Sequence, residues 1–120
     1  MKYILAIDDD EKILFALHEC IADLGYGVKV AHNGEEGLKL FKYKYNFDMV
    51  ITDINMPLLD GNEVAKHIKD SDKSDIPIIA ITGSYADIIN PDLFSIILLK
   101  PFSLSILKQA IRRFIRKNSN

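Results

Sequence analysis

Acidic side chains follow two short apolar runs of the sequence. Asp8, Asp9 and Asp10 come directly after the first run, and Asp53 comes directly after residues 49–52. Two carboxylates about 4 Å apart repel each other by roughly 4 kcal/mol at an effective dielectric near 20, so one must be protonated or a cation must neutralise them. Carboxylate oxygens without a nearby His or Cys suit a hard ion such as Mg²⁺, or Mn²⁺ in its place.

A hydroxyl and an ammonium group stand at the ends of two further apolar runs. Thr82 ends one of them, and Lys100, followed by Pro101, ends the other. Proteins usually hold Mg²⁺ through one or two carboxylates, waters and a phosphate oxygen, so a site of this kind suits phosphoryl chemistry. One carboxylate can act as the nucleophile and form an aspartyl phosphate. Lys100 would then meet the phosphoryl oxygens by charge, and Thr82 by a hydrogen bond.

Each of these residues also has a structural interpretation. The acids from Asp8 to Asp10 suit the N-cap and first turn of a helix. Asp53 could cap the turn that follows it, Thr82 could only end a strand, and Lys100 could be a solvated charge. The combination favours a functional site, because the polar groups stand at four strand ends of one predicted sheet.

The elements that would position these groups alternate regularly along the chain. Short apolar runs bounded by Asp, Gly and Pro are typical of buried strands; they lie at residues 3–7, 28–31, 49–52, 76–81 and 95–99. Amphipathic helices are predicted between and after them. Their boundary signals are Gly25 as a stop, Asn33 with Glu36 as a capping box, the turn at Asp60-Gly61, and Ser103 as an N-cap.

This βα pattern, repeated five times, predicts an α/β fold of the flavodoxin-like (βα)5 type. Strands that are apolar on both faces and joined by helices form a parallel sheet with helices on both sides, here in the order 2-1-3-4-5. Residues 84–94 hold only enough pattern for one or two turns before Pro91, so the fourth helix should be short or irregular. Ligands of such folds bind at the carboxyl ends of the strands.

Length and composition indicate one domain over residues 1–120. Fifteen Lys and Arg face seventeen Asp and Glu, which gives a net charge of −2 and argues against a dedicated nucleic-acid binder. The cluster of Arg112, Arg113, Arg116 and Lys117 suits a solvated helix end. Cys20 alone allows no intramolecular disulfide and is interpreted as a small buried side chain. No segment suits a signal peptide or a membrane span, so a cytoplasmic location is expected.

The sequence resembles the receiver (CheY-like) domain of two-component response regulators. The stretches that carry the resemblance occur in the right order and cover essentially the whole chain; they are ILAIDDDEKI, FDMVITDINMPLLDG, IPIIAITG and LLKPF. The resemblance implies that Asp53 accepts a phosphoryl group from a sensor histidine kinase or a histidine phosphotransfer protein. It implies Mg²⁺ ligation by Asp9, by Asp8 through water, by Asp53 and by the backbone carbonyl of Asn55.

In that family the hydroxyl at Thr82 moves toward the phosphoryl group and the lysine at Lys100 pairs with it. The Lys100-Pro101 bond would be cis, which is a plausible state for an X-Pro bond. The residues two beyond the acceptor and two beyond the Thr, here Asn55 and Ser84, influence dephosphorylation. Slow self-catalysed phosphorylation and dephosphorylation would be the only reactions of such a regulatory domain, which is not otherwise an enzyme.

Three features depart from the family pattern. Ile97 stands where a Tyr or Phe usually relays the movement of the Thr. The segment from Thr82 to Lys100 is shorter than usual, which alters the surface through which many receivers dimerise or meet their effectors; a weak homodimer remains one arrangement that the resemblance allows. Gly83 replaces the more usual Ala, and Gly37 lies inside a predicted helix without an evident reason.

Two other functions stay open at this point. Asp8-x-Asp10 after an apolar strand also resembles the haloacid dehalogenase phosphatase pattern, with Asp8 as the acceptor, although that interpretation leaves Asp53 unexplained. A degenerate receiver that serves only as a binding module is favoured by Ile97 and opposed by the complete acidic set.

Overall fold

The apolar runs form one parallel sheet in the order β2-β1-β3-β4-β5, as the sequence predicts. The computed structural model describes residues 1–43 and 45–115. The strands are β1 Tyr3–Ile7, β2 Gly27–Ala31, β3 Met49–Asp53, β4 Ile78–Thr82 and β5 Ile96–Leu99. β1, β3 and β4 are almost wholly buried because helices cover both faces of the sheet.

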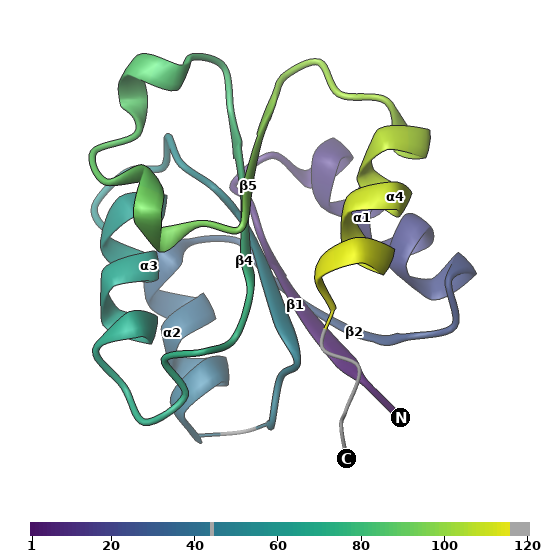
Figure 1. Cartoon of the computed structure of the whole chain (residues 1–120), viewed down its shortest axis with the longest axis horizontal. Helices are drawn as coiled ribbons and strands as arrows, with labels where there is room; N and C mark the ends of the chain where they lie inside the picture. The colour runs from purple at the N-terminus through teal and green to yellow at the C-terminus, as the bar shows by residue number, and fades with distance from the viewer. Residues whose placement is uncertain (44, 116–120) are drawn as a thin grey trace.

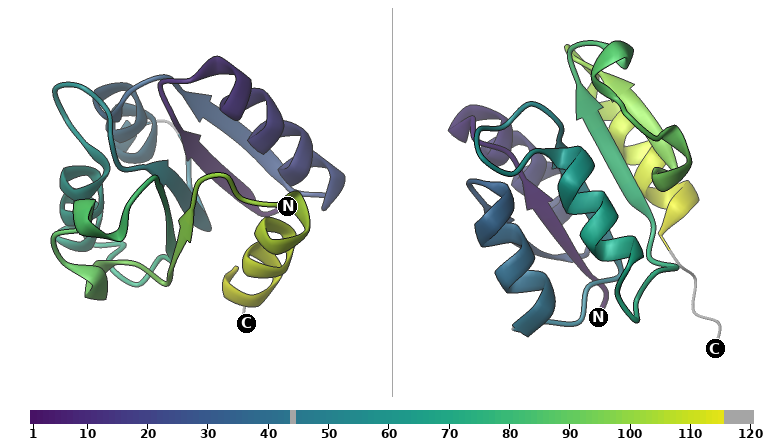
Figure 2. Two further views of the ribbon diagram at one scale, coloured as in Figure 1. Left: turned by 90° about the horizontal axis from the view of Figure 1, so that it is seen from above. Right: turned by 90° about the vertical axis from the view of Figure 1, so that its left-hand side faces the viewer.

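Four α-helices form the two outer layers of the described chain (Figures 1 and 2). They are α1 Glu11–Asp23, α2 Gly34–Tyr43, α3 Gly61–Lys69 and α4 Leu104–Phe114. α1 and α4 cover one face, where Cys20 is buried as predicted, and α2 and α3 cover the other. Alternate strand residues serve the two cores, such as Ile4 and Leu5 of β1. Within the described residues, no helix is both long and apolar enough to cross a bilayer.

The helix ends follow the predicted boundary signals. Gly25 adopts φ +90° just past α1, a conformation that favours glycine. The Asp60 and Glu63 side chains form a reciprocal capping box at the start of α3. The Ser103 hydroxyl accepts a hydrogen bond from the Ile106 N–H at the start of α4.

The start of α2 differs from the predicted capping box in one detail. The Asn33 side chain accepts from the Glu36 N–H, as expected, but the Glu36 carboxylate accepts from the N–H of His32 instead of Asn33. The structure also explains Gly37. A Cβ atom there would overlap the Ile7 side chain of β1, so glycine is what allows α2 to lie close to the sheet.

The connection between β4 and β5 contains two 3₁₀ turns, η1 Tyr85–Asp87 and η2 Pro91–Leu93, and no α-helix. Ser84 and Asn90 cap these turns. The prediction of a short or irregular fourth helix is therefore confirmed, and the fifth βα unit ends in α4. The basic residues Arg116 and Lys117 lie outside the described residues, whereas Arg112 and Arg113 form the basic last turn of α4.

Candidate functional site

The carboxyl ends of four strands bring the polar side chains to one edge of the sheet. Asp53 is the last residue of β3, Thr82 is the last residue of β4, and Asp8 follows β1. Lys100 follows β5, and its N–H donates to the Thr82 carbonyl over 2.8 Å. The Asp8, Asp53 and Thr82 side chains are buried. The parallel register thus gathers groups that lie far apart in the sequence.

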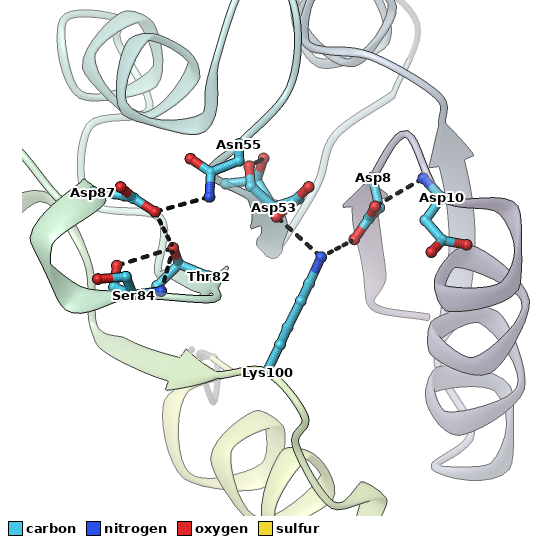
Figure 3. A network of polar contacts seen from close by, with 9 residues as sticks. Asp8, Asp10, Asp53, Asn55, Thr82, Ser84, Asp87 and Lys100 are labelled. Atoms are coloured by element: carbon cyan, nitrogen blue, oxygen red, sulfur yellow. Dashed lines mark hydrogen bonds and ion pairs between the residues drawn. The ribbon is translucent and has the colours of Figure 1, made fainter.

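The Lys100 ammonium group lies between two buried carboxylates (Figure 3). Its Nζ is 3.2 Å from Asp53 Oδ1 and 3.5 Å from Asp8 Oδ2. The Lys100-Pro101 peptide bond is cis, as the resemblance implies. Burial lowers the pKa of Lys100, but the attraction of Asp8 and Asp53 outweighs burial and leaves this pKa above its usual value. Lys100 is therefore a permanent positive charge in the site.

Three carboxylates face this single ammonium group. Asp8, Asp9 and Asp53 each offer a carboxylate oxygen, and these oxygens all lie within 4.8 Å of one another. Burial, opposed by Lys100, raises the pKa of Asp53. Burial and then the repulsion from Asp53 raise the pKa of Asp8 to about 6, although the Asp10 N–H acts in the opposite direction.

The donor set suits a hard divalent cation. Asp8 Oδ2 is completely buried and accepts no hydrogen bond from any described residue. Among the described residues, this oxygen forms an ion pair with Lys100, which Asp8 shares with Asp53. A buried carboxylate oxygen is costly without a partner, and a cluster made of oxygens alone matches the preference of Mg²⁺. The acid cluster therefore fits the predicted cation.

Asp10 has the structural role that the sequence left open for all three consecutive acids. Its side chain caps α1 by accepting from the Lys12 N–H over 2.9 Å. Its own N–H donates to Asp8 Oδ1, also over 2.9 Å, and so orients the buried carboxylate. Asp10 therefore caps α1, whereas Asp8 and Asp9 contribute to the acid cluster. The dehalogenase interpretation loses support, because it relies on an Asp8-x-Asp10 pair within the reaction centre.

Thr82 and Asn55 belong to a second polar network beside the acids (Figure 3). Thr82 Oγ1 lies 3.1 Å from the Ser84 carbonyl oxygen and 3.5 Å from Asp87 Oδ2. The Asn55 side chain donates to the same Asp87 oxygen over 2.8 Å. Sequence reasoning missed Asp87, whose only signal was an acidic residue in the irregular segment after β4.

Ile97 lies at the position where the resemblance to receiver domains implies an aromatic ring. It is half-buried in β5 and lies against the core beneath α2 and α3. Ile88, which follows η1, and Leu93, the last residue of η2, pack against the same core. Aliphatic packing thus replaces an aromatic side chain that could swing between buried and exposed positions.

Comparison with known proteins shows the family to which this domain belongs. The model of the response regulator receiver domain family matches residues 4–112, so the chain is a member of that family. Among curated proteins, it is 36% identical to a probable transcriptional regulator, ycf27, of Cyanophora paradoxa over 99% of this chain and 50% of the relative. It is 38% identical to ycf27 of Guillardia theta over 97% of this chain and 46% of the relative. The chain thus spans about half the length of these relatives.

Solved structures agree with this assignment. The response regulator TrrA of Thermotoga maritima, solved in complex with Mg²⁺-BeF, has a TM-score of 0.85 and 35% identity, with 95% of this chain and 99% of that chain covered. The chemotaxis protein CheY4 of Vibrio cholerae has a TM-score of 0.83 and 28% identity, with 95% and 98% covered. The resemblance and the flavodoxin-like fold are therefore confirmed, and the chain is a receiver domain of two-component signalling.

Proposed function

We propose that this receiver domain is a switch operated by phosphorylation of Asp53. The donor is a phosphohistidine on a sensor histidine kinase or on a histidine phosphotransfer protein. The observation that carries the proposal is the position of Asp53, buried at the end of β3 with the Lys100 ammonium group 3.2 Å from its Oδ1. A carboxylate beside a fixed cation and two further acids suits nucleophilic attack on a phosphoryl group.

The transfer step balances in charge and atoms. A carboxylate oxygen of Asp53 forms a bond to phosphorus, and the bond between phosphorus and the donor imidazole nitrogen breaks. The electron pair of that bond stays with the imidazole, which takes up a proton. Lys100 balances the negative charge on the transferred group, and the Thr82 hydroxyl donates to one of its oxygens.

Asp8, Asp9, Asp53 and the Asn55 carbonyl would hold Mg²⁺ in this domain. When bound, the ion supplies positive charge that screens the acids from the incoming phosphoryl oxygens. TrrA was solved with Mg²⁺-BeF, which supports the same choice of ion here. Mn²⁺ has similar oxygen preferences and would substitute for it.

The domain would act as a regulator and not as a metabolic enzyme. Its own chemistry would be limited to slow self-phosphorylation by small donors and slow hydrolysis, with Asn55 and Ser84 beside the site as the residues that admit or orient water. Two longer relatives are named probable transcriptional regulators. A cytoplasmic phosphorylation switch without nucleic-acid contacts of its own, which acts on an effector or through a weak homodimer, fits such an arrangement.

Intact-mass measurement after incubation with Mg²⁺ and acetyl phosphate tests this function. We expect a single phosphoryl adduct on the wild type and none on Asp53→Asn. An adduct that persists in Asp53→Asn but disappears in Asp8→Asn would instead support the phosphatase-like alternative. Absence of an adduct with acetyl phosphate and with phosphohistidine donors would support a binding module that is not phosphorylated.

A further inference from the structure

Asp87 adds a fourth carboxylate to the region of the acceptor. It belongs to η1, it is half-buried, and it reaches toward the site from the irregular β4–β5 connection (Figure 3). Its Oδ2 accepts from Asn55 Nδ2 over 2.8 Å and lies 3.5 Å from Thr82 Oγ1. One carboxylate oxygen therefore contacts the two polar side chains that border the phosphorylation site.

The position of Asp87 is fixed from α3. Asn62, a buried residue of that helix, donates through Nδ2 to the Asp87 carbonyl over 2.9 Å. The Asn62 side-chain oxygen accepts from the Ile89 N–H over 3.0 Å. The Asn62 side-chain amide thus holds the backbone on either side of Ile88, through its nitrogen at Asp87 and through its oxygen at Ile89. The Asp87 N–H also donates to the Ser84 carbonyl, which closes the turn.

We propose that Asp87 is a positioning residue that holds Asn55 and Thr82 in the unphosphorylated arrangement and is displaced when Asp53 carries a phosphoryl group. The inference rests on the proposed function, because it assigns the displacement to the phosphoryl group on Asp53. It goes beyond that function by identifying the group that couples the site to η1 in a chain whose usual aromatic position is occupied by Ile97.

Competition for one proton provides the first part of the coupling. A threonine hydroxyl has a single proton, which it can give to the Ser84 carbonyl, to Asp87 or to a phosphoryl oxygen. Once Thr82 donates to the phosphoryl group, Asp87 loses that partner. The hydrogen bond from the Asn55 amide remains, but Asn55 is exposed, so solvent competes for that bond.

Charge repulsion provides the second part. The phosphoryl group carries about −1.5 to −2 charges and replaces the single charge of the Asp53 carboxylate, so the site becomes more negative by roughly 0.5 to 1 charge beside Asp8 and Asp9. Lys100 forms its ion pairs with Asp8 and Asp53, so the added negative charge and Asp87 repel each other. Proton competition and repulsion both favour release of η1 from the site.

Binding of beryllofluoride with Mg²⁺, measured by calorimetry, tests the inference on the whole domain. Asp87→Asn removes the charge but keeps an acceptor, and Asp87→Ala removes both. We expect both variants to bind beryllofluoride more tightly than the wild type, on the order of tenfold, because the opposing charge is gone. Without beryllofluoride, the amide NMR signals of residues 84–89 should shift in Asp87→Ala toward their positions in the beryllofluoride-bound wild type, which a general loss of stability would not cause.

Asp92→Asn is the matched control, because it removes one exposed carboxylate from the neighbouring turn η2. It should bind beryllofluoride like the wild type. Equal affinity in the wild type and both Asp87 variants, or an equal gain in Asp92→Asn, would overturn the inference alone. Failure of the wild type to bind beryllofluoride would overturn the proposed function together with the inference.

Discussion

The buried carboxylate of Asp8 lowers the free energy of unfolding of the protein when no cation is bound. The Asp8 side chain is completely buried, and its pKa is raised to about 6, mainly by desolvation. A carboxyl group whose pKa is higher in the folded than in the unfolded protein binds its proton more tightly when folded. Its unfavourable contribution therefore grows as the pH rises from about 4 to about 6 and is complete above that range.

Asp8→Asn should thus stabilise the metal-free protein at pH 7 by about 1–3 kcal/mol, because the neutral amide removes the cost of burying an ionised carboxylate. The gain should nearly disappear at pH 4, where Asp8 is protonated in the wild type. Urea unfolding of both proteins with EDTA at the two pH values measures the difference. A gain of the same size at both pH values would mean that the charge on Asp8 is not its origin.

At the residue scale, the sequence predicted the groups whose position follows from strand ends. Asp53, Thr82 and Lys100 each end or follow an apolar run, so a parallel sheet necessarily brings them to one edge. Asp87 could not be found in this way. Its place depends on a 3₁₀ turn and on Asn62, a residue 25 positions earlier in the chain.

At the element scale, the start of α3 packs directly against the backbone at the end of β3. Gly61 donates its N–H to the Ile54 carbonyl over 2.9 Å. A Cβ atom on Gly61 would overlap the Asp53 carbonyl oxygen and the Ile54 backbone. The Asp60-Gly61 signal in the sequence therefore marks a close backbone approach beneath the acceptor as well as a turn.

Gly61→Ala should consequently destabilise the domain by about 1–3 kcal/mol, because either α3 or the end of β3 must move. Gly83→Ala is the matched control, since a Cβ atom there meets nothing within 4 Å. Thermal or urea unfolding of the two variants measures the contrast. Equal stability of both variants would show that the backbone beneath Asp53 can move without a loss in the free energy of unfolding.

The strands and most helices could be predicted because the signals for burial and for helix capping lie within short stretches of the sequence. β4 shows the limit of this reasoning. The apolar run begins at Ile76, yet the strand begins at Ile78, because apolar character signals burial and does not by itself signal strand pairing. Pro77 has no N–H to give to a ladder, although its carbonyl accepts from Val50.

At the scale of the whole molecule, the net charge of −2 conceals an uneven distribution. Asp8, Asp9 and Asp53 gather at one edge of the sheet, and Arg112 and Arg113 lie at the end of α4. A cation that binds only the folded acid cluster must stabilise the entire fold. The gain is about 2.7 kcal/mol when the free cation is at about 100 times its dissociation constant.

Addition of Mg²⁺ should therefore raise the unfolding temperature of the wild type, and chelation with EDTA should reverse the rise. Asp53→Asn should lose most of the response, because it removes one of the clustered carboxylates. Asp92→Asn should keep it, since that residue lies on η2. Calorimetric scans with and without Mg²⁺ would measure these shifts, and a full response in Asp53→Asn would place the cation elsewhere.

The two 3₁₀ turns between β4 and β5 have a consequence for the speed of switching. A turn of three residues has few hydrogen bonds to break, whereas a packed helix must shift as a unit. Loop motions take nanoseconds to microseconds, and collective helix motions take microseconds to milliseconds. In this domain the structural response should therefore follow each phosphoryl transfer almost at once, so the duration of a signal would be set by the lifetime of the phosphoryl group on Asp53.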